Sequence, residues 1–302
     1  MTKTVALIDG DILAYRCGFA AEHKKYKATI DGKEMVFDGK TALNTYLKEH
    51  PEVEEVEWES ELTVEPIDHV LSTVKHMIAN IKNELRADEV LLYLSARRTF
   101  RDDVATVLKY KGNRDKLRRP IHHDAILTYI NKYHGAITMP NLEADDMLAT
   151  ELLVRTEAGQ NAILCSIDKD LLQVPGKHYN FVTGKKVIIT PETGLRKLYE
   201  QMLMGDATDN IPGIYGLGPV TATKILSEYH STPSILWEAV KQQWDKHLAW
   251  ADKPPTWLTE YTKVQGRDVL HYPHWGTGER VTKSLDGFLK ELYTLLKVGV
   301  PT

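Results

Sequence analysis

Residues 161–170 read NAILCSIDKD, an apolar run that is followed at once by two carboxylates. A short continuous apolar run of this kind predicts a strand that is buried on both faces of a parallel sheet. A second such run, TVALID at residues 4–9, ends in Asp9. Because the working sites of open parallel sheets lie off the carboxyl ends of the strands, we expect Asp9, Asp168 and Asp170 to lie there together.

Helical patterns separate these runs. Apolar residues recur at helical spacing through residues 67–86, and two further helical stretches, at 122–135 and 143–159, each end in glycine. The segments EVLLYLS (89–95) and AITMP (136–140) predict two more strands. Strands that alternate with helices predict an α/β fold, in which helices flank a parallel sheet on both faces.

Two regions depart from this alternation. YKATIDGKEMVF (26–37) predicts a hairpin around Asp31-Gly32, and VEWESELTV (56–64) predicts a half-buried strand with an acidic outer face. From about residue 190 the pattern changes to helices and glycine-rich turns, and it ends in an amphipathic helix at LDGFLKELYTLLK (285–297). We therefore expect an α/β domain over residues 1–190, with a strand-rich insertion at about 24–66, and a helical region with a helical tail over 191–302.

Eight carboxylates from four separated segments stand at element ends. Alone, the acids of EADDM could serve only to favour the helix dipole, and MGDATDN could be an Asx-rich turn. Gathered in one cleft, they would repel strongly unless cations cancelled their charge, and oxygen ligands select Mg²⁺ or Mn²⁺. The candidate metal ligands are Asp9, Glu143, Asp145, Asp146, Asp168, Asp170, Asp206 and Asp209.

The formal net charge of −4 hides a basic stripe at residues 97–119, with six Arg and three Lys against three Asp. Such a stripe suits a protein that contacts a polyanion at one face. Within it, KYKGNR places Lys111 and Arg114 where both can reach one phosphate. The other candidate nucleic-acid contacts in the stripe are Arg97, Arg98, Arg101, Lys109, Tyr110, Arg118 and Arg119.

Neither Cys17 nor Cys165 belongs to a metal-binding or disulfide pattern, so both are expected to be buried thiols of a reducing compartment. The chain begins directly in a strand without a leader, and no segment has the length of a membrane span. These features predict a cytoplasmic protein that does not contact membranes, in the host cytoplasm if a phage encodes it.

The order of the motifs DGD, YKGNR, EADDM, SIDKDLLQ and GDATDNIPGIYGLGPVTATKIL resembles the 5′ nuclease superfamily over about residues 4–229. This superfamily comprises flap endonucleases, the 5′-nuclease domains of bacterial DNA polymerase I and phage 5′→3′ exonucleases. The chain is most similar in length to the phage enzymes. The resemblance implies a PIN-like α/β domain followed by a helix–three-turn–helix module that grips duplex DNA.

The resemblance also assigns roles to residues. Asp9, Glu143 and Asp145, with Asp146 beside them, match the ligands of a first metal ion, and Asp168, Asp170, Asp206 and Asp209 match those of a second. Lys111 and Arg114 match the basic pair that engages the scissile phosphate. The duplex-backbone grip matches the turn after residue 215, where relatives often hold K⁺ on backbone carbonyls; its candidate residues here are Gly216, Gly218, Thr221 and Lys224.

The chain departs from the family pattern at two places. Ser95 stands where many relatives carry an Asp, which leaves the first metal site one carboxylate short. The stretch between YKGNR and EADDM has room for one helix, whereas larger flap endonucleases place a longer arch there. This favours trimming from a 5′ end over threading of a long flap.

The implied activity is two-metal 5′→3′ hydrolysis of duplex DNA by a monomer, with 5′-flap cutting and degradation of RNA–DNA hybrids as further substrates. Two alternatives remain. IDGD at Asp9 and Asp11 also resembles the opening motif of haloacid-dehalogenase-type phosphatases, which would use them as nucleophile and acid/base; Asp11→Asn should abolish a phosphatase and only weaken a nuclease. Ser95 leaves room for a non-catalytic DNA-binding protein of the same fold.

Overall fold

The computed structural model describes residues 3–30, 32–53, 56–250 and 254–299 of the chain. Its centre is a five-stranded sheet in the order β5-β1-β6-β7-β8, in which the first four strands are parallel and β8 is antiparallel to β7. The sheet is therefore mixed, and only the edge strand departs from the parallel prediction. Its strands are β1 (Thr4–Asp9), β5 (Glu89–Tyr93), β6 (Asn161–Cys165), β7 (Gly176–Tyr179) and β8 (Lys186–Ile189).

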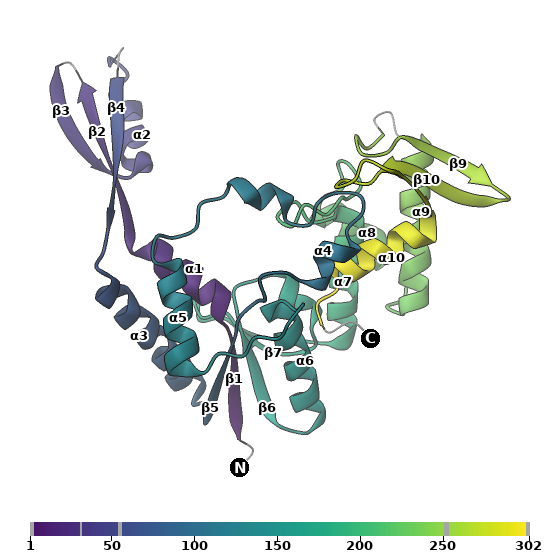
Figure 1. The fold of residues 1–302 in the computed structure, drawn as a ribbon, viewed down its shortest axis with the longest axis horizontal. Coiled ribbons are helices and arrows are strands. Elements are labelled where there is room, and N and C mark those ends of the chain that lie inside the picture. Colours follow the sequence, from purple (N-terminus) through teal and green to yellow (C-terminus); the bar gives the residue numbers. More distant parts are fainter. Residues whose placement is uncertain (1–2, 31, 54–55, 251–253, 300–302) are drawn as a thin grey trace.

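Helices cover both faces of this sheet, as the continuous apolar strands predict (Figure 1). Ala6 and Ile8 of β1 face α1 (Gly10–Ala20), α3 (Ile67–Leu85) and α5 (His123–His134). Val5 and Leu7 alternate with them and pack instead against α6 (Ala144–Glu157). Both cysteines are free and buried, as expected. The expected strand at AITMP is wrong, because this segment forms only an isolated bridge between Tyr93 and Ile137.

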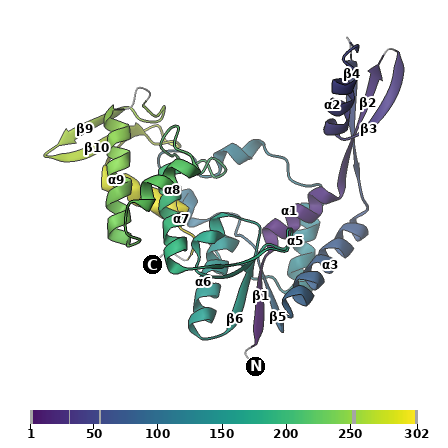
Figure 2. The ribbon, with the colours of Figure 1, turned by 180° about the vertical axis from the view of Figure 1, so that it is seen from behind.

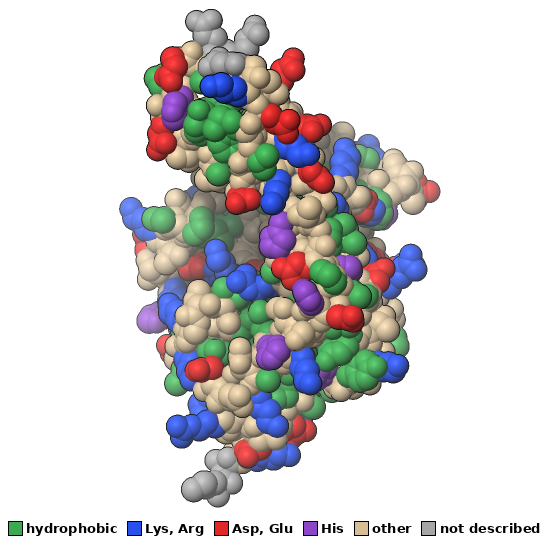
Figure 3. Space-filling model, turned by 90° about the vertical axis from the view of Figure 1, so that its left-hand side faces the viewer, with side chains coloured by type: hydrophobic (Ala, Val, Ile, Leu, Met, Phe, Trp, Pro, Cys, Tyr) green, Lys and Arg blue, Asp and Glu red, His purple; other side chains and the backbone are tan. Residues whose placement is uncertain are grey.

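Residues 22–64 form a separate lobe that projects from the body (Figures 1 and 2). It contains β2 (Glu22–Ile30), β3 (Lys33–Asp38), α2 (Lys40–Glu49) and β4 (Val56–Val64), and has a small core of its own around Tyr26 and Leu43. The hairpin prediction is confirmed by the pairing of β2 with β3; Asp31 of its turn lies outside the described residues. Acidic and basic side chains lie close together on the lobe (Figure 3).

The prediction that β4 is half-buried is wrong. Trp58 is 48% exposed and Leu62 is 38% exposed, although the alternation places both on the apolar side of the strand. The lobe stands away from the main body, and the element that packs on its sheet is the short helix α2. The hydrophobic cluster that α2 completes includes Val56 of β4 but does not include Trp58 or Leu62.

The segment from residue 105 to 122 connects α4 (Phe100–Val104) to α5 and crosses from one side of the molecule to the other (Figures 1 and 2). Its middle is a 3₁₀ turn, η1 (Gly112–Lys116). It is fastened at its start, where Glu291 accepts hydrogen bonds from the Thr106 amide and hydroxyl at 2.7 and 2.6 Å. The part of the basic stripe from residue 105 onward therefore lies on a segment that is anchored by the C-terminal part of the chain.

The region after residue 190 contains both helices and a sheet, so the expected wholly helical tail is corrected. A second core, which includes Trp244 and Phe288, joins these elements. Within the described residues, no helix has the combination of length and apolarity that a membrane crossing requires. The elements of this region are α7 (Pro191–Met204), α8 (Pro219–Ser227), α9 (Pro233–Trp250), β9 (Glu260–Val264), β10 (Arg267–Pro273), β11 (Arg280–Ser284) and α10 (Leu285–Leu296), and a 3₁₀ turn, η2 (Asp170–Gln173), lies earlier in the chain, between β6 and β7.

Candidate active site

The first group of acids lies where β1 and β6 end and α6 begins. Asp9 ends β1 and caps α1, accepting from the Ile12 amide at 3.0 Å and from Ser166 Oγ at 2.8 Å. Burial raises the pKa of Asp9 to about 7, and repulsion from Asp11 and Asp168 contributes. Burial also raises the pKa of Asp145 well above its usual range, with repulsion from Asp9 and Asp168 as the next causes. These carboxylates therefore share one electrostatic environment.

The second group comprises Asp170, Asp206 and Asp209. Burial raises the pKa of Asp170 to about 7, and repulsion from Asp168 and Asp206 adds to it. Asp206 organises its own loop, since its Oδ1 accepts from the amides of Thr208 at 2.7 Å and Asp209 at 3.2 Å. Asp168 connects the two groups, because it repels members of both. A single pocket is lined by Glu143 and Asp145 together with Asp170, Asp206 and Asp209.

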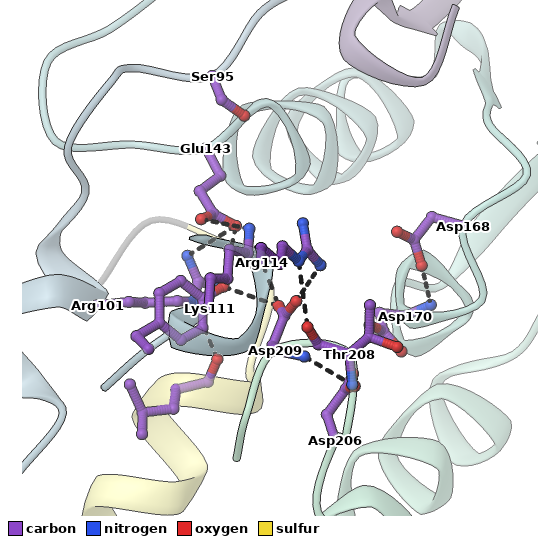
Figure 4. A network of polar contacts seen from close by, with 12 residues as sticks. Ser95, Arg101, Lys111, Arg114, Glu143, Asp168, Asp170, Asp206, Thr208 and Asp209 are labelled. Atoms are coloured by element: carbon purple, nitrogen blue, oxygen red, sulfur yellow. Dashed lines mark hydrogen bonds and ion pairs between the residues drawn. The ribbon is translucent and has the colours of Figure 1, made fainter. Parts of the chain in front are cut away.

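Lys111 and Arg114 lie against two of these acids, Glu143 and Asp209 (Figure 4). Lys111 Nζ is 2.8 Å from Glu143 Oε1 and 3.9 Å from Asp209 Oδ2. Arg114 forms an ion pair with Asp209 and donates from Nε to the Thr208 carbonyl at 3.1 Å. Although burial alone would raise the pKa of Glu143, the neighbouring Lys111 and Arg101 lower it. Two cationic side chains thus partly balance the negative charge of the pocket.

The donor chemistry of the pocket fits hard divalent cations, because half-buried and buried carboxylates from three segments line it and Asp9, from a fourth, is near enough to raise the pKa of Asp145. In the described part of the chain, however, no three acidic, histidine or cysteine side chains stand close enough together to hold one ion. Glu143 and Asp209 are paired instead with Lys111 and Arg114. The residue types in the pocket therefore fit the predicted metal ions, but the described side chains are not arranged as a complete set of ligands around one ion.

Three predicted site residues have other roles in the structure. Arg101 is 2% exposed and makes two parallel hydrogen bonds to Asp146, which is fully buried, at 2.7 and 2.8 Å. The remaining bonds to Asp146 come from the Glu143 and Gly299 amides, so its carboxylate is committed to protein donors and is not a free metal ligand. Tyr110 is also buried, and its hydroxyl donates to Asp209 at 2.9 Å and to Glu143 at 3.2 Å. The expected DNA contacts of Arg101 and Tyr110 are therefore corrected.

The other predicted DNA contacts lie at or near the surface. In the stripe, Arg98 pairs with Asp103, Lys109 with Asp115 and Arg118 with Glu22. The turn before α8 has Gly216 in a left-handed conformation (φ +75°) and Gly218 as the residue that caps the helix. DNA binding by these residues stays a prediction; those that are exposed in the structure are Arg97, Arg98, Arg118, Arg119, Gly216, Thr221 and Lys224.

Sequence reasoning missed the position of Asp11 relative to Ser95. Gly10 packs so closely on the end of β5 that an added Cβ would lie 2.7 Å from the Tyr93 carbonyl oxygen. This contact places Asp11 over Ser95, whose amide donates to Asp11 Oδ2 at 2.9 Å. The Ser95 hydroxyl in turn accepts from the Ala144 amide at 2.9 Å. Asp11 therefore adds a carboxylate to the first acid group, and Asp11→Asn no longer separates a phosphatase from a nuclease.

Two buried glutamines were also missed, because an isolated Gln in a helical pattern gives no signal in the sequence. Gln201 of α7 donates to Asp170 Oδ1 and accepts from Gln173 of η2. Both side chains are buried. Together they orient the Asp170 carboxylate of the second acid group.

Comparisons with known proteins find relatives of this chain among the 5′-3′ exonucleases. A curated 5′-3′ exonuclease of Buchnera aphidicola subsp. Baizongia pistaciae (strain Bp) is 30% identical over 164 residues, which are 48% of this chain and 52% of that protein. A curated 5′-3′ exonuclease of Aquifex aeolicus (strain VF5) is 27% identical over 195 residues, 60% of this chain and 67% of that protein. The matches thus span about half to two thirds of these relatives.

Among solved structures, the T5 D15 protein co-crystallized with metal ions has a similar fold, with a TM-score of 0.51 and 14% identity. That similarity covers 98% of this chain and 85% of the T5 protein. A family model described as the 5′-3′ exonuclease, N-terminal resolvase-like domain matches residues 4–200, which contain β1, α6, β6 and most of the acids. The chain therefore belongs to the 5′-3′ exonuclease family.

Proposed function

We propose that this protein is a metal-dependent 5′→3′ exodeoxyribonuclease that hydrolyses phosphodiester bonds of duplex DNA. The observation that carries the proposal is the pocket itself, which is lined by carboxylates from three segments and in which Lys111 and Arg114 pair with Glu143 and Asp209. A phosphatase of the haloacid-dehalogenase type would leave most of these groups without a role. Membership of the 5′-3′ exonuclease family supports the nuclease.

We propose that Asp9, Glu143 and Asp145 hold one Mg²⁺, and that a second ion is held by Asp168, Asp170, Asp206 and Asp209; Mn²⁺ can replace Mg²⁺. When bound, such ions make hydroxide available at neutral pH and stabilise charge on the leaving oxygen. The T5 D15 protein, which shares the fold, was co-crystallized with metal ions. Asp146 would support the first site indirectly, because it accepts from the Glu143 amide at 3.1 Å.

The protein's own cations would act on the substrate. In the structure Lys111 pairs with Glu143 and Arg114 pairs with Asp209. A phosphate that enters the pocket would replace these carboxylates as the partner of the two cations. Arg supplies a planar fork and Lys a point charge, and both would stabilise charge on the phosphoryl oxygens. Removing one such donor typically costs about 2.7–4 kcal/mol in transition-state stabilisation.

The duplex would extend from the pocket toward α8. The turn at Gly216 and Gly218, the exposed Thr221 in the first turn of α8 and the exposed Lys224 in its last turn would contact the DNA backbone, with K⁺ as a further ion at the glycine turn. The exposed arginines of the stripe would neutralise phosphates, which makes binding strongly salt-dependent. We also propose that 5′ flaps and RNA–DNA hybrids are substrates. We further propose that the protein is a monomer and that it acts in the cytoplasm.

Asp168→Asn tests this function, because Asp168 interacts with both acid groups. The variant should lose Mg²⁺-dependent cleavage of a duplex while its DNA affinity in EDTA stays at the wild-type value. The matched control is Asp124→Asn, which removes a carboxylate on α5 outside the pocket, where the side chain is 92% exposed, and should cleave normally. Retained turnover by Asp168→Asn would refute the assignment.

A non-catalytic DNA-binding protein is the second candidate. It is favoured by one observation, namely that no three acids of the described residues are positioned to hold one ion. Wild-type protein that binds duplex DNA but cleaves nothing in either Mg²⁺ or Mn²⁺ would establish this alternative.

A further inference from the structure

The end of α10 and the residues after it, which we call the C-terminal segment (295–299), lie against the acid pocket. Leu295, Leu296 and Val298 line the same pocket as Glu143, Asp145 and Asp170. This segment lies outside residues 4–200, which match the family. It contributes backbone groups to two hydrogen-bond networks, and each network leads to one of the two acid groups.

The first network connects the C-terminal segment to the start of α6. Arg101 donates from Nε to the Leu295 carbonyl at 2.9 Å and from Nη2 to the Lys297 carbonyl at 2.8 Å. The same guanidinium forms the paired bonds to Asp146, and the Gly299 amide donates to Asp146 Oδ1 at 3.1 Å. Because Asp146 also holds the Glu143 amide, the helix end that presents Glu143 and Asp145 is fixed to the C-terminal backbone.

The second network connects the segment to Asp170. Gln173 Nε2 donates to the Leu296 carbonyl at 2.9 Å, and the Val298 amide donates to Gln173 Oε1 at 3.4 Å. Gln173 also donates to Gln201, which donates to Asp170. Gln173 and Gln201 are both buried, so water cannot take the place of a lost hydrogen-bond partner. Losing one of these bonds leaves a buried polar group unpaired, which destabilises the folded state.

We propose that the C-terminal segment is a positioning element of the active site, which holds the start of α6 and Asp170 at a fixed separation. The inference rests on the proposed nuclease function. Two acid groups that carry like charge repel each other, and their spacing must be maintained by groups that are themselves held rigidly. The segment provides this because its consecutive backbone groups bind Arg101 on one side and Gln173 on the other.

The test compares truncation after Leu296, which removes the partners at Lys297, Val298 and Gly299, with truncation after Gly299 as the matched control. Both keep α10 and its core side chains. We expect the first to lower kcat by at least about tenfold, equivalent to about 1.4 kcal/mol, with KM for DNA and binding in EDTA unchanged. Amide exchange at Glu143 should also become faster. The control should match the full chain.

Gln173→Met is the second variant, for the case in which the shorter truncation does not fold. It keeps the volume of the side chain but removes its bonds to the segment and to Gln201. We expect the same loss of kcat without a change of KM. Variants with wild-type kcat, or a loss of kcat that only follows a loss of folded protein, would overturn the inference while full-length protein still cleaves. A full-length protein that does not cleave would overturn the proposed function, and the inference with it.

Discussion

Asp9, which is buried, and Asp170, which is half-buried, should make the stability of the protein depend on pH in an unusual direction. Burial raises the pKa of each to about 7, well above the roughly 3.9 of an unfolded Asp. Between these values the folded state binds more protons than the unfolded state, so the free energy of unfolding falls as pH rises. In EDTA we therefore expect the Tm to decrease from pH 5 to pH 8, where most mesophilic proteins are stable.

Mg²⁺ should counter this loss, because it binds the ionised carboxylates. The Tm increase on adding Mg²⁺ should be larger at pH 8 than at pH 5, and Asp170→Asn should flatten the pH dependence in EDTA. The pKa of Glu143 is lowered by Lys111 and Arg101 despite burial, so its effect lies below this pH range. Burial lowers the pKa of three histidines, which opposes the trend, but five acids have a raised pKa; the histidines are His134, His178 and His247. A Tm in EDTA that rises across this range would contradict the described environment of the acids. Thermal unfolding followed by circular dichroism measures both effects.

Residue type and position identified the acids and Lys111, but they could not show which side chains are turned inward. Arg101 and Tyr110 lie in the basic stripe, whose charge predicts a surface, yet both are buried against Asp146, Glu143 and Asp209. The burial of Arg101 depends on backbone carbonyls 194 and 196 residues away in the chain. No local pattern contains that information.

At the scale of elements, the loop between α7 and α8 positions Asp206 and Asp209 through two glycines. An added Cβ at Gly213 would lie 1.8 Å from the Met204 carbonyl oxygen, and Gly205 has φ +67° with the Gly213 amide nitrogen 2.5 Å from its Cβ position. Gly213→Ala should therefore destabilise the protein by about 1–3 kcal/mol and lower cleavage by displacing the two acids. Urea unfolding and the duplex cleavage assay measure the two effects.

Gly276→Ala is the control for this prediction. Its added Cβ would meet only His274 atoms, at the ordinary contact distance of 3.6 Å, in a turn between β10 and β11. Stability and cleavage should both stay at the wild-type value. A Gly213→Ala protein with wild-type stability would show that the loop is not packed as described.

Elements with one strong local signal were predicted well, whereas those that depend on partners were not. β1, β6 and α6 follow from continuous apolar runs and from an acidic helix start with a glycine after the end. AITMP is as apolar as a strand, but it pairs with the sheet only at Ile137. β9, β10 and β11 are short and mixed in composition, and they are defined by their pairing with one another and by the packing of β10 and β11 on α10.

At the scale of the whole molecule, the lobe of residues 22–64 should be dispensable for catalysis. It has its own small core, and its two ends meet where the Glu65 amide donates to the Ala21 carbonyl at 2.9 Å. Replacing residues 24–62 with a two-glycine turn would join His23 to Thr63, which are paired neighbours on β2 and β4. We expect a folded protein whose Tm changes little and whose cleavage of a short duplex is retained. Loss of cleavage by a folded deletion variant would assign the lobe a part in substrate binding instead.

The central claim is that the pocket hydrolyses DNA from a 5′ end with divalent cations. The most direct measurement uses a duplex labelled at the 5′ end of one strand and the 3′ end of the other, incubated with the protein in Mg²⁺ or in EDTA. We expect short 5′-labelled products and progressive shortening of the 3′-labelled strand in Mg²⁺, and no change in EDTA. Cleavage that continues in EDTA, progressive shortening from the 3′ end, or DNA binding without any cleavage would contradict the claim.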